Sequence, residues 1–255
     1  MQRLAMWFFL CCSAPAASAQ AGAPARIILV GDSTMATRTG YGDALCARLQ
    51  PEGRCINLAR GGRSSGSFRA EGLWDQVPAL LRDGASYSAT YVLIQFGHND
   101  QPGKPGRSTD LVTQFPANMT RYAAEVRALG AVPVLVTPLT RRSFRGAWLH
   151  DDLAPWSDAT RRAARSARVD LLDLNAISAA AVQAMGPQEA DTLAQAPPSP
   201  ANAPAPANAS EPQGTPPPKF DYTHVGAKGA AVFSAMVANE LVRLHPELAA
   251  MLRQP

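Results

Sequence analysis

A serine, an aspartate–histidine pair and several small or amide residues stand in four short blocks of this sequence. The blocks are Gly31–Met35, Gly61–Ser65, Phe96–Asp100 and Asp221–His224. They offer a hydroxyl nucleophile, backbone and amide N–H groups that can bind an anion, and a histidine with a nearby carboxylate. Acyl transfer through a serine requires these groups. The four blocks together predict a site for this chemistry more strongly than any one of them alone.

The first and last blocks contain a possible nucleophile and its base. Ser33 needs a base, because a serine hydroxyl is a poor nucleophile at neutral pH. His224 suits this role, since the reference pKa of histidine is about 6.5. Asp221 stands three residues earlier, so its carboxylate can reach the far ring nitrogen and stabilise the imidazolium. The alternatives are that Ser33 and Asp221 cap a turn or helix and that His224 is a surface residue.

The two middle blocks contain possible donors to an oxyanion. Gly62 has no side chain to block its N–H, and the N–H of Ser33 faces the same space. The Asn99 amide donates without titrating. The alternatives are a flexible turn at Gly62 and an Asx-type turn at Asn99. His98 is a weaker candidate for the base than His224, because a lone histidine at a strand end is more often structural.

Arginine side chains near these blocks could face an acidic substrate. We select Arg63 in the second block, and Arg141 and Arg142 in a later loop, as candidate substrate-binding residues. The alternative is that they only keep the surface soluble. The net charge of +4 is mild and no basic tract is interleaved with aromatic residues, so we expect no nucleic-acid partner.

Apolar runs alternate with amphipathic segments along the chain. The expected strands are 26–30, 55–58, 90–96, 131–136 and 169–172. The expected helices are 41–49, 73–81, 115–129, 158–167, 176–185 and 227–244. This alternation predicts an α/β fold whose parallel sheet is covered on both faces, with the strand-to-helix loops at its carboxyl edge. Because ligands bind at that edge, the first three blocks should share one site.

The first 19 residues have the layout of a signal peptide. Arg3 gives a basic start, residues 4–12 are apolar, and residues 17–19 form a small-residue cleavage site. Export would make the protein secreted or periplasmic. The alternatives are a buried N-terminal helix and a lipoprotein anchored through Cys11. We expect no membrane span, because the apolar run is too short and no later segment is long enough.

The remainder predicts a single domain over residues 26–250. A Pro- and Ala-rich insertion at 196–218 lacks any apolar period, which favours a flexible segment. Cys46 and Cys55 are left once the signal is removed, and they form either a structural disulfide or two buried thiols. A metal site is not expected, because no further Cys or His stands at ligand spacing.

The four blocks resemble the signature blocks of the SGNH, or GDSL-type, hydrolase superfamily. More narrowly, they are similar to the rhamnogalacturonan acetylesterases, a carbohydrate esterase family, as are the intervening loops at 137–144 and 173–178. The likeness runs from residue 26 to the final helix, with the Pro-rich segment as a departure. It implies a three-layer α/β/α, flavodoxin-like domain with a five-stranded parallel sheet.

The resemblance also implies roles for individual residues. Ser33 would be the nucleophile, His224 the base and Asp221 its orienting acid, with Ser33, Gly62 and Asn99 as oxyanion donors. No metal or organic cofactor is implied. The expected activity is the removal of O-acetyl groups from a plant cell-wall polysaccharide, most of all pectic rhamnogalacturonan. The alternatives are an esterase for acetyl-xylan, another acyl sugar or a lipid, and a catalytically idle carbohydrate-binding protein. We expect a monomer.

Overall fold

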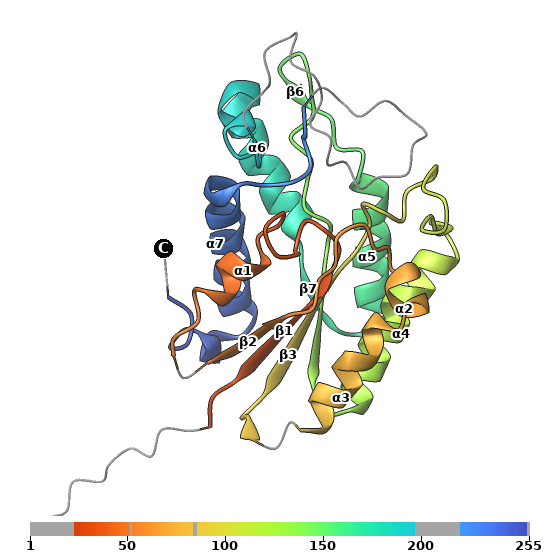
Figure 1. The fold of residues 1–255 in the computed structure, drawn as a ribbon, viewed down its shortest axis with the longest axis vertical. Helices are drawn as coiled ribbons and strands as arrows, with labels where there is room; N and C mark the ends of the chain where they lie inside the picture. Colours follow the sequence, from red (N-terminus) through yellow and green to blue (C-terminus); the bar gives the residue numbers. More distant parts are fainter. Residues whose placement is uncertain (1–22, 52, 84–85, 197–219, 254–255) are drawn as a thin grey trace, which may run out of the picture.

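A parallel sheet of five strands forms the middle layer of the protein (Figure 1). The computed structural model describes residues 23–51, 53–83, 86–196 and 220–253. The expected signal peptide lies outside these residues, and so does the expected insertion apart from Ala196. The strands, in spatial order, are β2 (Arg54–Asn57), β1 (Arg26–Gly31), β3 (Thr90–Gln95), β4 (Val132–Val136) and β7 (Asp170–Leu172). The predicted sheet is therefore confirmed.

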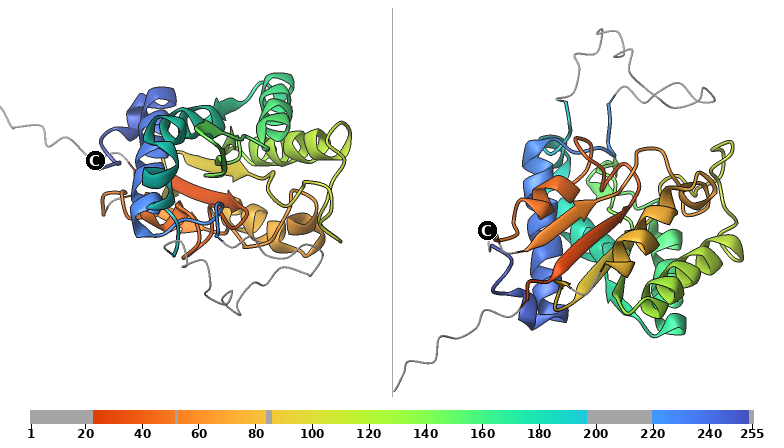
Figure 2. Two further views of the ribbon diagram at one scale, coloured as in Figure 1. Left: turned by 90° about the horizontal axis from the view of Figure 1, so that it is seen from above. Right: turned by 60° about the horizontal axis from the view of Figure 1, so that its bottom comes forward.

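The central strands are apolar on both faces. In β1, Ile27 and Leu29 point into one core, whereas Ile28 and Val30 point into the other. Successive side chains of a strand alternate between the two faces, so a continuous apolar run must be covered on both. This pattern accounts for a sheet between two helical layers, the three-layer α/β/α architecture expected from the sequence (Figure 2).

Each helical layer packs an apolar stripe onto one face of the sheet. One layer contains α1 (Gly42–Cys46), α6 (Leu174–Asp191) and α7 (Ala227–Leu244). The other contains α2 (Ser67–Ala70), α3 (Gln76–Arg82), α4 (Gln114–Ala128) and α5 (Ala154–Ala167). There are also short 3-10 turns, η1 (Leu73–Asp75) and η3 (Pro246–Leu248). Within the described ranges, no helix combines the length and apolar character needed to cross a bilayer.

Some element boundaries differ from those expected. Helix α5 begins four residues earlier than predicted, with Pro155 in its first turn, where proline is well tolerated. Helix α6 is interrupted at Gly186, which has a φ of 73° and precedes Pro187, so the predicted end at residue 185 coincides with a break. The predicted helix at 41–49 is shorter and ends at Cys46.

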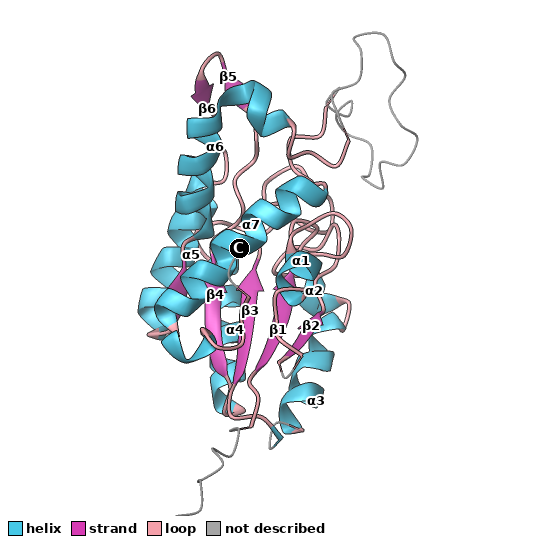
Figure 3. Cartoon of the chain, turned by 90° about the vertical axis from the view of Figure 1, so that its left-hand side faces the viewer, coloured by secondary structure: helices cyan, strands magenta, loops and turns pink. Residues whose placement is uncertain are grey.

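A small antiparallel hairpin was not predicted. It pairs β5 (Phe144–Arg145) with β6 (Trp148–Leu149) and lies beside α6 (Figure 3). Gln183 of α6 holds it, accepting a hydrogen bond from the Leu149 N–H and donating one to the Ala147 carbonyl. Strands of two residues are too short to show a period in the sequence, so periodicity does not predict them.

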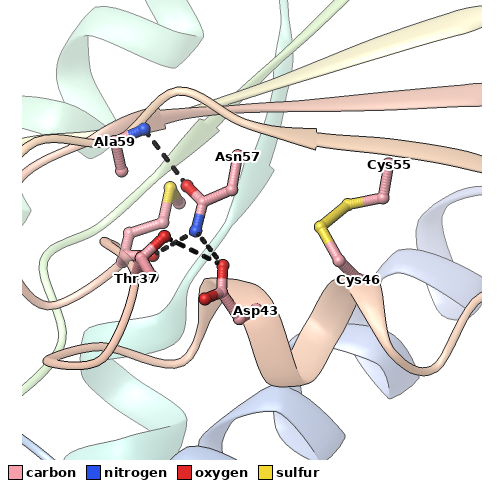
Figure 4. The surroundings of a disulfide bond; sticks show 7 residues. Thr37, Asp43, Cys46, Cys55, Asn57 and Ala59 are labelled. Atoms are coloured by element: carbon pink, nitrogen blue, oxygen red, sulfur yellow. Dashed lines mark hydrogen bonds between the residues drawn. A yellow bond between two sulfur atoms is a disulfide. The ribbon is translucent and has the colours of Figure 1, made fainter.

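A disulfide joins Cys46 of α1 to Cys55 of β2, which settles the alternative left open by the sequence (Figure 4). Asn57, at the end of the same strand, donates to the carbonyl of Met35 and to the carboxylate of Asp43. The covalent bond and these hydrogen bonds tie the edge strand, α1 and the loop after β1 together. That loop carries Ser33, so its surroundings are braced from two sides.

Candidate active site

Three of the four sequence blocks follow neighbouring strands of the sheet. The loops after β2, β1 and β3 carry Gly62, Ser33 and Asn99, and those strands are adjacent in that order. Arg60 donates its backbone N–H to the carbonyl of Gly31 at 2.9 Å, which sets the first two loops side by side. The chain changes winding direction between β1 and β3, the position where open parallel sheets bind ligands.

The loop after β1 is organised by Asp32. Its carboxylate accepts hydrogen bonds from the N–H and the hydroxyl of Thr34, at 2.9 and 2.8 Å. Its carbonyl accepts from the N–H groups of Met35 and Ala36. The neighbouring Ser33 is 8% exposed, so its side chain lies at the edge of a closely packed turn rather than free in solvent.

His98 lies beneath this loop as the partner of Asp32. Its Nδ1 is 3.2 Å from a carboxylate oxygen of Asp32, and both side chains are buried. Burial alone would raise the pKa of Asp32, but the charge and hydrogen bond of His98, together with the hydrogen bonds from Thr34, lower it. His98 is therefore bonded to the turn that carries Ser33, and the choice of His224 as the base stays a prediction.

The last sequence block forms a turn, residues 221–224, which we call the Asp–His turn. His224 Nδ1 lies 2.8 Å from one carboxylate oxygen of Asp221. The other oxygen accepts from the N–H groups of Thr223 and His224, at 2.8 and 2.9 Å. Burial would raise the pKa of Asp221, but the hydrogen bonds and charge of His224 outweigh it and lower that pKa to about 2. Asp221 is therefore ionised at neutral pH and can orient the imidazole.

Thr39 connects the Asp–His turn to the loop that carries Ser33. The N–H of Val225, the residue after His224, donates to the Thr39 carbonyl at 3.0 Å. The Thr39 hydroxyl donates to the carbonyl of Ser33 at 2.7 Å. Two segments almost 200 residues apart thus share one bridging residue. The Asp–His turn and the loop that carries Ser33 are therefore neighbours at the carboxyl edge of the sheet.

The loops at residues 61–66 and 97–101, which we call the donor loops, are linked by Arg107. Its Nη1 donates to the Gly62 carbonyl at 3.2 Å and to the Asn99 Oδ1 at 3.4 Å. The Asn99 amide donates to the carbonyl of Arg63 at 3.1 Å, which leaves its second N–H available to a ligand. Gly62 has a φ of 76°, a conformation that favours glycine. Arg107, a lone arginine in a loop, gave no signal in the sequence.

A buried carboxylate also joins the donor loops. Asp100 accepts hydrogen bonds from the N–H and hydroxyl of Ser65 and from the hydroxyl of Thr109. Its side chain is fully buried, and burial raises its pKa to about 6 although these hydrogen bonds lower it. Tyr122 of α4 holds the same loop by donating to the Ser65 carbonyl at 2.8 Å.

One predicted substrate-binding residue is in fact part of the interior. Arg142 is 0% exposed, and its guanidinium donates to the carbonyls of Asp221 and His224 at 2.7 and 2.9 Å. The prediction that Arg142 contacts substrate is therefore wrong. The sequence places Arg142 next to Arg141 in a loop, but it does not show which carbonyl groups the Arg142 guanidinium hydrogen-bonds.

The other two predicted arginines are engaged with protein groups. Arg63 pairs with Glu71 at 2.9 Å, and its side chain is 40% exposed. Arg141 forms an ion pair with Asp152 and donates to the Thr223 hydroxyl at 3.1 Å. Both lie at the rim of the site, so a role in binding stays a prediction for them.

The described residues supply a hydroxyl, an imidazole oriented by a carboxylate, and N–H donors at one edge of the sheet. Among the same residues, no group of three or more His, Cys, Asp or Glu side chains could hold a metal ion. The sequence is matched over residues 29–232 by the model of the GDSL-like lipase/acylhydrolase family. The chain belongs to this family.

Relatives support the narrower resemblance as well. The chain is 35% identical over 179 residues to rhamnogalacturonan acetylesterase RhgT of Bacillus subtilis, covering 67% of this chain and 73% of that protein. It is 28% identical over 239 residues to the rhamnogalacturonan acetylesterase of Emericella nidulans, covering 81% and 80%. The resemblance stated from the sequence blocks is confirmed.

Solved structures share the fold. Protein YxiM of Bacillus subtilis superposes with a TM-score of 0.65 at 22% identity over 87% of this chain, which spans 57% of the YxiM chain. A variant of Axe2, an acetyl-xylooligosaccharide esterase from Geobacillus stearothermophilus, gives a TM-score of 0.57 at 16% identity, covering 85% and 93%. At these identities the likeness concerns architecture.

Proposed function

We propose that this protein is a serine esterase that removes O-acetyl groups from a plant cell-wall polysaccharide. The observation that carries the proposal is the Asp221–His224 hydrogen bond of 2.8 Å, in a turn joined through Thr39 to the loop of Ser33. Family membership supports ester hydrolysis, and the acetylesterase relatives support an acetyl group on a carbohydrate.

In the proposed first half-reaction, Ser33 attacks the carbonyl carbon of the acetyl ester. His224 takes the hydroxyl proton on Nε2, while Asp221 bonds Nδ1 and stabilises the imidazolium that forms. The negative charge on the carbonyl oxygen is stabilised by the N–H groups of Ser33 and Gly62 and by the Asn99 amide. The tetrahedral intermediate collapses, His224 protonates the sugar oxygen, and an acetyl-serine remains.

The second half-reaction uses the same groups with water as the nucleophile. His224 removes a proton from the water, which attacks the acetyl-serine carbonyl, and the same donors stabilise the second oxyanion. Collapse of the intermediate returns the proton to Ser33 and releases acetate. No further group is needed for the atoms and charges to balance.

Pectic rhamnogalacturonan is the polysaccharide that we favour. Two of the relatives are named as rhamnogalacturonan acetylesterases, and their identities to this chain exceed those of the structural neighbours. Uronate groups in pectin are anionic, and exposed arginines at the sheet edge complement them. Arg38 and Arg60 are exposed and their side chains have no partner within the described part of the chain. They join Arg63 and Arg141 as candidates.

The first test measures hydrolysis of p-nitrophenyl acetate by the wild type and by Ser33→Ala. We expect the substitution to abolish turnover beyond a residual rate, because the nucleophile is lost. Equal rates would sink the esterase proposal and favour a catalytically idle carbohydrate-binding protein.

The second test separates the substrate classes by measuring acetate release from acetylated rhamnogalacturonan, acetylated xylan and long-chain acyl esters. The expected order places the pectic polymer first. Preference for xylan would move the proposal to an acetylxylan esterase, and preference for long-chain esters would end the polysaccharide proposal.

We also propose that the protein acts outside the cytoplasm after cleavage behind Ala19. The Cys46–Cys55 disulfide supports this, because such bonds persist in oxidising compartments. The mass of the mature protein from its native host distinguishes cleavage behind Ala19 from a lipid-modified Cys11 and from an uncut chain.

A further inference from the structure

Arg142 donates to every backbone carbonyl of the Asp–His turn. Its Nη2 reaches the carbonyls of Asp221 and His224, at 2.7 and 2.9 Å. Its Nη1 makes a longer contact of 3.5 Å with the carbonyl of Thr223, and its backbone N–H donates to that of Tyr222 at 2.9 Å. Four consecutive acceptors are therefore satisfied by one residue that is 80 positions distant in sequence.

Two N–H groups of the same turn are satisfied from within. The Asp221 carboxylate accepts from the N–H groups of Thr223 and His224, while its second oxygen bonds the imidazole. A turn outside any helix or strand lacks the repeating hydrogen bonds that hold a backbone in one conformation. Here Asp221 holds the N–H groups and Arg142 holds the carbonyls, so the path of the backbone between Asp221 and His224 is constrained on both sides.

Burying a guanidinium is costly unless its N–H groups are hydrogen-bonded. Both Nη groups of Arg142 have carbonyl partners, whereas its buried Nε has none among the described residues. Burial lowers the pKa of Arg142, and the nearby charges of Asp221 and Asp191 oppose that shift. Arginine also has a property that lysine lacks, since its planar fork presents donors in several fixed directions at once. One ammonium group could not reach the carbonyls of Asp221, Thr223 and His224 together in the same geometry.

We propose that Arg142 is a positioning residue that aligns His224 with Ser33 by fixing the backbone of the Asp–His turn, without contacting substrate. This inference rests on the proposed function, because it assumes that His224 is the catalytic base and that its orientation affects the rate. It replaces the substrate-binding role that the sequence suggested for Arg142.

The test compares Arg142→Lys with Arg145→Lys, the same exchange three residues later at an exposed position. Hydrolysis of p-nitrophenyl acetate is measured for each, with circular dichroism to establish folding. We expect R142K to lower kcat between about tenfold and about a hundredfold with KM changed less than twofold, because small displacements of reacting groups have effects of this size. R145K should match the wild type.

A general loss of structure is distinguished by repeating R142K in a His224→Ala background. If Arg142 acts only by aligning the imidazole, R142K lowers the residual rate of the His224→Ala enzyme by less than twofold. An equal loss in both backgrounds would overturn the inference. So would wild-type kcat in R142K, or an R142K protein that does not fold, since Arg142 would then serve overall stability.

Different results would contradict this inference and the proposed function. If Ser33→Ala is as active as the wild type, the esterase proposal falls whatever R142K does. If Ser33→Ala is inactive and R142K retains full kcat, only the role of Arg142 is lost.

Discussion

The Asp–His turn and the donor loops lie at the same edge of the sheet but are held by different chemistry. The turn is partly open, with the side chains of His224 and Asp221 26% and 43% exposed. In the donor loops Ser65, Asn99 and Asp100 are buried, whereas Gly61 is exposed and Gly62 is half-buried. Proton transfer needs access and a tuned charge, whereas oxyanion stabilisation needs donors that do not move. The burial of Asn99 and the partial exposure of His224 are consistent with the tasks proposed for them.

The carboxylates of the two regions also differ. Asp221 has a pKa lowered to about 2, mainly because His224 outweighs the effect of burial. Asp100 has a pKa raised to about 6, because burial outweighs its hydrogen bonds to Ser65 and Thr109. The first is therefore suited to remain charged beside an imidazolium. The second serves as a hydrogen-bond acceptor between loops, so changing each should affect different properties of the enzyme.

The largest effect should come from Asp221→Asn. An asparagine cannot stabilise the imidazolium and favours the wrong tautomer of His224, so kcat should fall by about 10⁴-fold. Initial rates with p-nitrophenyl acetate measure this loss. Asp158→Asn, an exchange at an exposed position of α5, is the control and should leave kcat unchanged. A loss below tenfold for Asp221→Asn would mean that His224 works without its carboxylate.

The next effect concerns the donor loops. Asn99→Ala removes a side-chain donor without altering the Asp–His turn, and kcat should fall by about 10²- to 10³-fold. Because the donor acts on the developing oxyanion, KM for the acetate ester should change little. If KM rose and kcat stayed constant, Asn99 would bind substrate rather than stabilise the transition state. The proposed contrast between the two regions would then not hold.

The stability of the protein should report the raised pKa of Asp100. Between about pH 4 and pH 6, the Asp100 carboxyl group holds its proton more tightly in the folded state than in the unfolded state. Raising the pH through that window therefore removes stability, by at most about 3 kcal/mol for a shift of this size. For Asp221 the sign is opposite, since stability is present above about pH 4 and is lost as pH falls towards 2.

Urea unfolding of the wild type and Asp100→Asn at several pH values measures the first of these effects. From pH 4 to pH 6, the unfolding free energy of the wild type should fall relative to that of Asp100→Asn. A difference independent of pH would show that Asp100 does not titrate in this window. Asparagine keeps the size of the side chain but carries no titratable proton, so the comparison isolates the charge.

How much of the fold and of the candidate site can be predicted from the sequence depends on whether each signal lies within a short stretch of the chain. Helix α7 matches its predicted bounds, and all five strands of the sheet were expected, because apolar periodicity reports burial directly. The serine, the histidine and its carboxylate were selected from short motifs, and the segments that carry them are linked through Thr39, while their catalytic roles stay predictions. Arg142 was misassigned and Arg107 was missed. Their partners are carbonyl and amide oxygens of other loops, which no local pattern reveals.

The smallest effect should come from Arg107→Lys, which keeps the charge but cannot reach the Gly62 carbonyl and the Asn99 Oδ1 together. We expect kcat to fall about tenfold through misplacement of the donors. Arg121→Lys, an exchange on the exposed face of α4, is the control and should retain wild-type kcat.

The His224→Ala background makes this last prediction a direct test of the division between the two regions. An enzyme without its base retains the residual rate that the oxyanion donors and binding provide. Arg107→Lys should therefore still lower the rate about tenfold in that background, whereas Arg142→Lys should not lower it. If both arginine variants lost their effect together, the donor loops would act through the histidine, and the two regions would form one coupled unit rather than two.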